Sequence, residues 1–328
     1  MIIFYERNRM WREVKHVFKD GAWEWHEFSQ GDTEGLKKLA REKVSYDLYQ
    51  WIEKSASMQT NSIMVDTFHK GSEWVAGSLV FKQDLDDKDD FHYFHFFVAE
   101  NFMITSGLNF EVLGKKDYPL LKKQMGNGDN ALEGFSVLLG EITTGSLMEI
   151  DPFEEQLNDL FWRMKKENST SVLEEIYHYR HELLVLKHLM IPLQEIKIAM
   201  EEAFGERATG KQEYRRTCLK IERGFKIANE YQAEIDTLIK LEEVVSTHRG
   251  NEIMKTLTVL TTLFTPITAL GALWGMNFRN MPELEWKYGY VFAIGLVVLS
   301  TLVLYIVLKR KGWSGDILRG KKRNSFFK

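Results

Sequence analysis

The chain has 328 residues, a formal net charge of −4 and a mean hydropathy of −0.29, and 27% of its residues are charged. This length predicts about two domains, and the charge content places most of the chain in water. An acidic balance argues against nucleic-acid binding, which needs a basic surface to neutralise phosphates. Cys218 is the only cysteine. No disulfide can therefore form within the chain, which suits a reducing compartment.

Residues 1–129 are expected to form an α/β domain. Aromatic and β-branched runs separated by glycine-containing breaks predict strands in WREVKHVF, GAWEWHEF, EWVAGSLVFK and FHYFHFFVAENFMIT. TEGLKKLAREK and DLYQWIEKSA predict short helices between them. The acidic run at 83–90 lacks the glycine and the final glutamate of a calcium loop. We expect it to be a solvated hairpin tip.

From about Asn130 the apolar residues recur at helical spacing. Residues 130–210 are expected to form long antiparallel helices, with a start or kink at Asp151-Pro152. Another helix is expected to begin near Lys211 and contains no proline before Pro266. Such length is unusual in globular proteins and typical of stalks. We expect this helix, over residues 211–278, to continue directly into the membrane.

Two uncharged runs lie near the end of the chain, at residues 256–278 and 288–308. Each is long enough to cross a bilayer, for which about 20 residues suffice. The predicted organisation is an external loop at 279–289, a second transmembrane helix at 290–309 and a basic tail at 310–328. Positive charge after the second run places the tail inside. Because the N-terminus has scattered charges and no secretory signal, both termini are expected in the cytoplasm of a multi-pass protein of the cell membrane.

The first of these runs contains six threonines, whereas the second consists almost entirely of large apolar residues. Asn251, Met254 and four threonines follow one another at steps of 3, 4, 3, 4 and 3 residues, which places them in one stripe along a helix: Thr258, Thr261, Thr265 and Thr268. Small polar stripes join helices in lipid, and hydroxyl stripes also line water-filled pores. Periodicity alone leaves both interpretations open. A pore with two spans per chain requires an oligomer.

The run NEIMKTLTVLTTLFTPITALGALWGMNFRNMPELEWKYGY strongly resembles the signature region of the CorA family of magnesium transport proteins. It includes the GMN motif and the MPEL that follows, and the upstream LKHLMIPLQEI at 186–196 is similar to the family's helix pattern. The resemblance implies a funnel-shaped homopentamer with a cytosolic α/β domain and a helical stalk. It places Gly275, Met276 and Asn277 at the outer mouth of the pore. There, the Asn277 side chains of the five copies would form a ring that meets the hydrated ion. It implies that the path is lined by Asn251, Met254, Leu257, Thr258, Thr261, Thr265 and Thr268.

The residues in these runs suit a hard cation. Mg²⁺ prefers oxygen ligands and gives up water reluctantly, and an amide oxygen can bind its hydration shell without retaining the ion as carboxylates would. The runs contain no cysteine or histidine for zinc or copper. Glu283 and Glu285 would raise the cation concentration at the mouth, although Arg279 and Lys287 offset them. Mg²⁺ is thus expected as the transported ion, with Co²⁺ and Ni²⁺ as further candidates, and not as a catalytic cofactor.

The chain departs from the family's pattern in the stalk. Arg216 occupies the position where other members carry an acidic regulatory ligand, and arginine cannot bind a metal. Gating by internal Mg²⁺ then uses other acids, such as Glu213 or Asp236, or is weakened or absent. Thr265 stands where a larger apolar residue is common, which makes the path wetter. The partners expected are further copies of the chain, membrane lipids and divalent cations.

Three alternatives to a passive magnesium channel are considered. One is a zinc transporter of the ZntB type, against which the intact GMN motif weighs. A second, of another class, is a membrane-anchored sensor or scaffold without transport. An enzyme is disfavoured because the sequence contains none of the common catalytic motifs.

Overall fold

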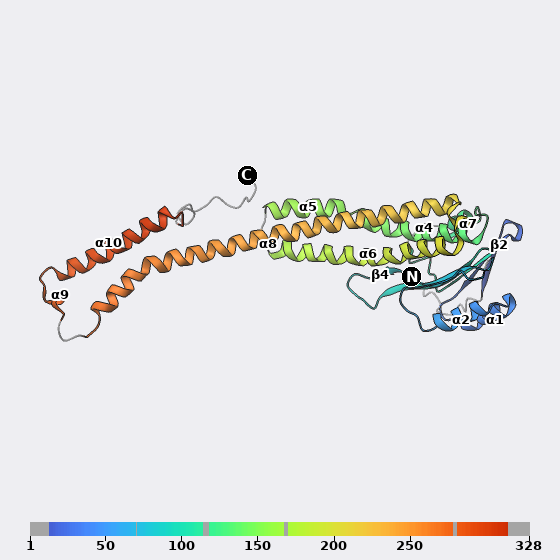
Figure 1. Ribbon diagram of the computed structural model, residues 1–328, viewed down its shortest axis with the longest axis horizontal. Coiled ribbons are helices and arrows are strands. Elements are labelled where there is room, and N and C mark those ends of the chain that lie inside the picture. The colour runs from blue at the N-terminus through green and yellow to red at the C-terminus, as the bar shows by residue number, and fades with distance from the viewer. Residues whose placement is uncertain (1–12, 70, 114–117, 167–169, 278–280, 314–328) are drawn as a thin grey trace, which may run out of the picture. The chain divides into compact units, whose positions relative to one another are not determined.

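The computed structural model describes residues 13–69, 71–113, 118–166, 170–277 and 281–313 (Figure 1). The chain divides into two compact units, which are described separately. The first comprises Met1–Leu160 and Glu174–Ile235, and the second comprises Phe161–Leu173 and Asp236–Lys328.

A six-stranded sheet forms the centre of the first unit, with the order β1-β2-β6-β5-β4-β3. β2 and β6 pair in parallel, and every other neighbouring pair is antiparallel. A short 3-10 turn, η1 (Lys19–Gly21), connects the first two strands. The strands are β1 (Val14–Phe18), β2 (Trp23–Phe28), β3 (Ser62–Asp66), β4 (Trp74–Gln83), β5 (Phe91–Ala99) and β6 (Phe102–Ser106).

The sheet confirms the predicted mixed α/β class but corrects one strand. The run FHYFHFFVAENFMIT forms two strands, β5 and β6, which turn at Glu100-Asn101 and pair antiparallel. The polar pair breaks the apolar run because it allows the chain to reverse there. β3 was not predicted, since four of its five residues are only partly buried and the strand lies at the sheet edge.

The acidic run at 83–90 forms the tip of the β4–β5 hairpin, as predicted. Asp84 Oδ1 accepts hydrogen bonds from the backbone N–H groups of Asp86 and Asp87, at 2.8 and 3.0 Å. Asp87 Oδ1 accepts from the N–H of Asp89 at 2.9 Å. These carboxylates shape an exposed turn by bonding to its own backbone.

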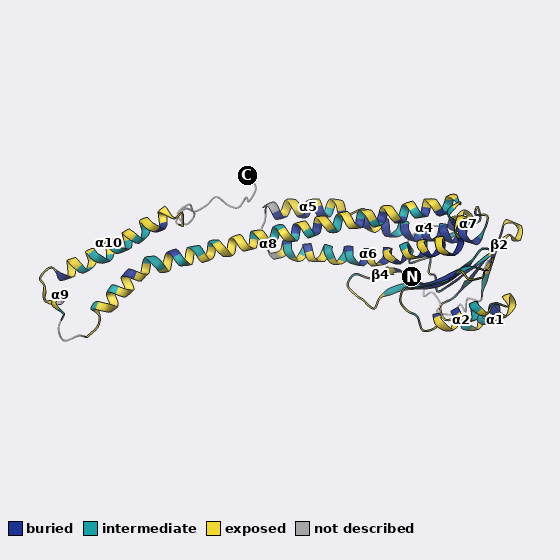
Figure 2. Cartoon of the chain, in the orientation of Figure 1, coloured by how far each residue is buried: buried dark blue, intermediate teal, exposed yellow. Residues whose placement is uncertain are grey.

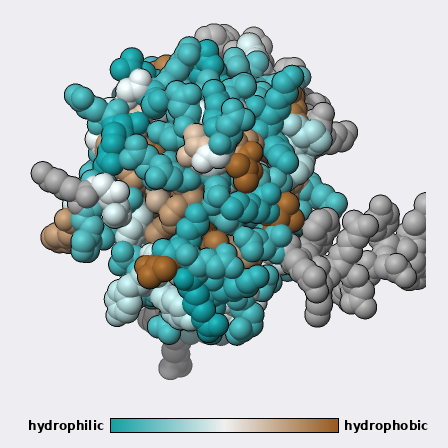
Figure 3. All heavy atoms as spheres, turned by 90° about the vertical axis from the view of Figure 1, so that its right-hand side faces the viewer, coloured by the Kyte–Doolittle hydropathy of each residue, from teal (hydrophilic) through white to brown (hydrophobic). Residues whose placement is uncertain are grey.

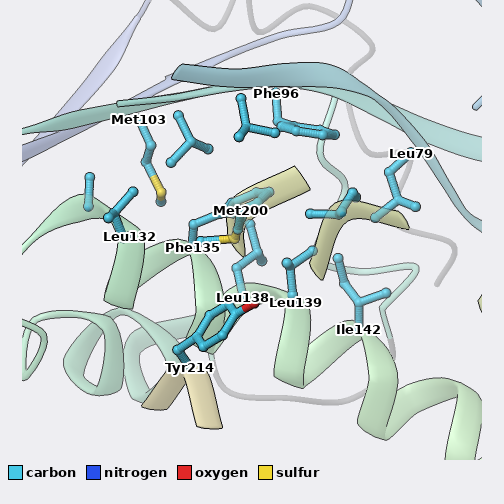
Figure 4. Packing of buried hydrophobic residues seen from close by; sticks show 14 of the residues in the cluster. Leu79, Phe96, Met103, Leu132, Phe135, Leu138, Leu139, Ile142, Met200 and Tyr214 are labelled. Carbon is cyan, nitrogen blue, oxygen red and sulfur yellow. The ribbon is translucent and has the colours of Figure 1, made fainter. Parts of the chain in front are cut away.

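Helices cover both faces of the sheet. On one face, α1 (Thr33–Lys43) and α2 (Tyr46–Ser55) bury Leu39 and Trp51 against Phe97 and Ile104. Each helix begins with a side-chain cap: Asp32 Oδ1 accepts from the N–H of Gly35, and Ser45 Oγ accepts from the N–H of Leu48. On the other face, α4 (Ala131–Ile150) packs its apolar residues on the sheet (Figure 4).

The helical part of the chain follows the predicted order. α3 (Tyr118–Met125) precedes α4, which ends at Ile150, and α5 begins at Phe153, so the break at Asp151-Pro152 is confirmed. α8 is one uninterrupted helix of 63 residues that includes Pro266. The bounds are α5 (Phe153–Lys166), α6 (Thr170–Phe204), α7 (Glu206–Thr209) and α8 (Gln212–Trp274).

The second unit contains the C-terminal part of α8, the short α9 (Pro282–Glu285) and α10 (Gly289–Arg310). α8 and α10 are the two helices of the described chain that are long and apolar enough to cross a membrane. Only 6% of the apolar window of each helix is buried, and both are mainly exposed in Figure 2. The surface of the chain seen in Figure 3, by contrast, is mostly hydrophilic with isolated hydrophobic residues.

Candidate ion pathway

The threonine stripe lies on the C-terminal part of α8, and its hydroxyl donors are used within the helix. Thr258 donates to the carbonyl of Met254 at 2.7 Å, and Thr265 donates to that of Thr261 at 2.8 Å. Thr261 and Thr268 each reach two carbonyls, at 3.0 to 3.2 Å. Because every proton is directed at the backbone, each hydroxyl oxygen keeps its acceptor capacity for a group outside the helix.

The stripe is accessible along almost its full length. Thr261, Thr265 and Thr268 are exposed, and Thr258 is half-buried. Asn251, at the end of the stripe that comes first in the chain, is exposed, as are Met254 (62%) and Leu257 (52%). The single chain thus leaves this face uncovered. An uncovered face that presents oxygen acceptors suits either of the two interpretations, a water-filled path or contact with another copy.

Pro266 adds an acceptor that the sequence reasoning missed. It lies inside α8 and has no N–H, so the carbonyl of Thr262, four residues earlier, lacks the donor that it would have in a regular helix. The Thr262 hydroxyl donates to the Thr258 carbonyl at 2.7 Å, so it does not replace the missing donor. The signal was present in the sequence as a proline four positions after Thr262.

The GMN segment ends α8. The N–H of Gly275 donates to the carbonyl of Gly271 at 2.9 Å, and that of Met276 donates to Leu273 at 3.4 Å. A Cβ at position 275 would lie 3.0 Å from the Gly271 oxygen, so glycine permits this tight closure. Asn277 follows as an exposed residue. Its side chain forms no hydrogen bond within the described part of the chain, which leaves its amide oxygen available.

The predicted external loop is described in part. Residues 278–280, with Arg279, lie outside the described residues, as does the side chain of Glu283. Glu285 is exposed at the end of α9. The Trp286 ring contacts those of Tyr288 and Phe292, with centroids 6.3 and 5.7 Å apart. Such amphipathic rings are typical of a membrane–water interface.

The other end of α10 is basic. Its last turn carries Lys309 and Arg310, and both are exposed together with Lys311. Between the two ends, α10 is apolar around its whole circumference, as a helix surrounded by lipid should be. Residues 314–328 of the predicted basic tail lie outside the described residues.

The stalk position that departs from the family holds an ion pair. Arg216 Nη1 donates to Glu213 Oε1 at 2.7 Å, and the arginine side chain is 59% exposed. Glu213, one of the acids proposed as a substitute ligand, is therefore already neutralised within its own helix. Asp236 is half-buried and has partners of its own.

Acids also gather beside the β4–β5 hairpin, where Asp84, Asp90, Glu149 and Glu182 line a cavity of about 390 Å³. Burial raises the pKa of both Glu149 and Glu182. For each of them, burial outweighs the opposing effect of a nearby basic residue, Lys82 for Glu149 and His178 for Glu182, and so disfavours the charged form. Across the described residues, no group of three or more histidine, cysteine or acidic side chains is arranged to hold a metal ion.

The two long apolar helices mark a membrane protein that also has a large α/β part. Residues 20–310 match the family described as CorA-like Mg²⁺ transporter protein. The chain belongs to this family, which confirms the resemblance seen in its GMN region.

Named relatives agree with this assignment. The chain is 41% identical over 308 residues to the magnesium transport protein CorA of Bacillus subtilis, which covers 94% of this chain and 96% of that one. It is 26% identical over 200 residues to the cobalt/magnesium transport protein CorA of Thermotoga maritima, covering 56% and 50%. The solved CorA structure from Methanocaldococcus jannaschii shares the fold, with a TM-score of 0.63, 17% identity and coverage of 91% and 93%.

Proposed function

We propose that this chain carries Mg²⁺ across the cell membrane as a homopentameric channel, without catalytic activity. The observation that carries the proposal is the exposed stripe of hydroxyl acceptors on α8, which leads towards Asn277, whose amide has no hydrogen-bond partner among the described residues. Family membership and the named function of the Bacillus subtilis relative support the choice of ion. The Thermotoga maritima relative adds Co²⁺ as a candidate, and Ni²⁺ remains a further one.

The chemistry of the stripe suits a hydrated ion. The water molecules around Mg²⁺ donate hydrogen bonds, so a path that carries them needs acceptors. The threonine hydroxyls present acceptors because their protons are bound to α8 carbonyls. Neutral oxygens hold the hydrated ion weakly enough to release it, which conduction requires. Asn277 would form the first ring, and Met254 and Leu257 would form a constriction at the other end.

The oligomer follows from the number of spans. Two helices per chain cannot enclose a path, so several copies must surround an axis, each contributing one α8. Both termini would lie in the cytoplasm, with the soluble part at 1–129, antiparallel helices at 130–210 and the stalk at 211–278. The loop at 279–289 would face out, followed by the second span at 290–309 and the tail at 310–328.

The membrane potential is sufficient to drive uptake. A double charge moving inward across 100 mV gains about 4.6 kcal/mol, twice the value for a single charge. The described parts of the two spans contain no Asp, Glu or His that could relay protons. We therefore propose passive transport that is independent of a proton gradient. Since Arg216 is bound to Glu213, inhibition by internal Mg²⁺ would be weak.

The test is ion flux into vesicles that contain the purified protein, with an inside-negative potential. Mg²⁺, Co²⁺, Ni²⁺ and Zn²⁺ are compared with and without a proton gradient. We expect saturable Mg²⁺ uptake that follows the potential and ignores the proton gradient. Zinc uptake that requires the gradient would favour a ZntB-type transporter. The absence of flux for every ion, with intact oligomers, would favour a sensor or scaffold.

A further inference from the structure

The beginning of α8 is bonded to the main chain of α4. Thr217 Oγ1 donates to the carbonyl of Ser136 at 2.7 Å, and both residues are buried, with 5% and 1% of their surfaces exposed. One turn further along α8, Lys220 Nζ donates to Thr144 Oγ1 at 3.1 Å and to the carbonyl of Gly140 at 3.4 Å. Two side chains of α8 therefore bind carbonyls four residues apart on α4.

The two helices approach each other closely at this point. A Cβ built on Gly140 would lie 2.6 Å from Thr217 Oγ1 and 3.6 Å from Thr217 Cβ, so only glycine fits. One turn beyond Lys220, Gly224 lies against the methyl group of Met190 and the side chain of Leu147. Displacing α8 along α4 by one residue, about 1.5 Å, would bring a side chain to the place that Gly140 leaves open. The contact therefore permits one register.

The contacts of α8 change along its length. Its buried residues continue from Tyr214 to Leu238, and beyond Gly224 its Gln232 Oε1 accepts a hydrogen bond from Lys187 Nζ of α6 at 2.6 Å. Residues 239–258, all of them described, include no buried residue. Figure 2 shows this change from dark to light along the helix. The unbroken series of buried contacts of α8 thus ends at Leu238, whereas the predicted ion path lies further along the helix.

We infer that Thr217 and Lys220 are positioning residues that fix α8 to α4 in one register throughout transport. Displacements of α8 that open or close the path then occur beyond Leu238. This inference rests on the proposed transport function, which needs α8 to carry the stripe. Two observations support the inference. If the helices slid, the hydrogen bonds to the main-chain carbonyls would break, and Thr217 would no longer lie against Gly140, where there is room for it.

A reversible crosslink tests whether the contact stays formed. The 3.6 Å between the two Cβ positions lies within the range that a disulfide requires. The variant Gly140→Cys, Thr217→Cys, Cys218→Ser would have no other cysteine. We expect an intramolecular disulfide to form in the full-length protein in vesicles. Oxidation should not lower Mg²⁺ flux, because the disulfide holds the two helices in the same register. Each single-cysteine variant in the Cys218→Ser background serves as the control.

Three outcomes of this experiment separate the inference from the proposed function. Flux that stops on oxidation and returns with reductant would show that α8 moves against α4, and would overturn the inference alone. A folded variant that forms no disulfide would show that the helices do not keep this register. If the unmodified protein carries no Mg²⁺, the proposed function itself fails.

A second pair of variants covers the case in which the cysteines prevent folding. Thr217→Val removes the hydrogen bond to the Ser136 carbonyl, and Thr217→Ser keeps it. We expect Thr217→Val to lower maximal flux at least twofold with the half-saturating Mg²⁺ concentration unchanged, because the ion-binding end is untouched. Thr217→Ser should restore the flux. A Thr217→Val protein that is less stable but transports normally would reduce Thr217 to a structural role and overturn the inference.

Discussion

Two threonines on the same helix show how differently the two regions of the molecule use a hydroxyl group. Thr217 is buried and donates to the main chain of another helix, at Ser136. Thr265 is exposed and donates to its own helix, at Thr261. In the α/β unit, polar groups find partners from distant parts of the chain. In the apolar helices, polar groups keep acceptors for something outside the chain.

The largest effect is expected at Asn277, the free amide at the end of the stripe. Asn277→Ala removes the oxygen proposed to bind the hydrated ion, so Mg²⁺ flux into vesicles should fall at least tenfold. Oligomer assembly should not change, because the side chain has no partner in the described chain. Asn251→Ala, at the other end of the stripe, is the matched comparison. Normal uptake by Asn277→Ala would remove this residue from the site.

The second effect concerns a carboxylate whose partners are all inside the α/β unit. Burial alone would raise the pKa of Glu24, but hydrogen bonds from Lys15, Lys43 and His26 outweigh it and lower the pKa to about 2. A lowered pKa stabilises the folded state above the ordinary value of 4.5, and this stability is lost as the pH falls from 4.5 towards 2. We expect about 1–3 kcal/mol, measured by urea unfolding between pH 7 and pH 3.

Glu24→Gln tests the origin of that loss. It should lower stability at pH 7 and flatten its dependence on pH below 4.5. Ion flux should be less sensitive, because the threonine stripe contains no group that titrates near neutral pH. An unchanged acid-unfolding profile in Glu24→Gln would show that another group controls it.

The third effect separates the two threonines directly. Thr217→Val should lower the free energy of unfolding by about 1 kcal/mol, the usual value of one hydrogen bond. Thr265→Val should leave stability unchanged and lower Mg²⁺ flux severalfold, because it removes an acceptor from the path. Thr256→Val is the control: Thr256 bonds to the Glu252 carbonyl in the same way but lies off the stripe. Equal flux losses in Thr256→Val and Thr265→Val would contradict a one-sided path.

The smallest effect is expected at Arg216. Because the Arg216–Glu213 pair is exposed, breaking it should change stability by less than about 1 kcal/mol. Arg216→Asp would place an acid at the position where the resemblance to the family predicts a regulatory ligand. Inhibition of flux by internal Mg²⁺ should then become stronger than in the parent protein, with Arg216→Ala as the control. Strong inhibition already present in the parent would show that other residues sense the ion.

The sequence predicted the α/β class, the long helix and both apolar helices because each follows a local pattern of spacing or composition. It missed the turn at Glu100-Asn101, since the apolar run continues across it and only the antiparallel pairing of β5 with β6 reveals two strands. It also missed the bond from Thr217 to Ser136, because residues 81 positions apart carry no joint signal in one sequence. For the threonine stripe, periodicity identified the face of α8 that carries the hydroxyls. A single chain does not show whether water or another helix lies against that face.

The most direct test of the central claim is the accessibility of the stripe to water during transport. Thr265→Cys and Thr256→Cys, each with Cys218→Ser, are treated in vesicles with a charged, water-soluble thiol reagent while Mg²⁺ flux is recorded. The account predicts rapid block of Thr265→Cys, slowed by Mg²⁺, and no block of Thr256→Cys. Unaffected flux in Thr265→Cys, with the thiol unreacted, would show that the stripe joins helices and does not line the path.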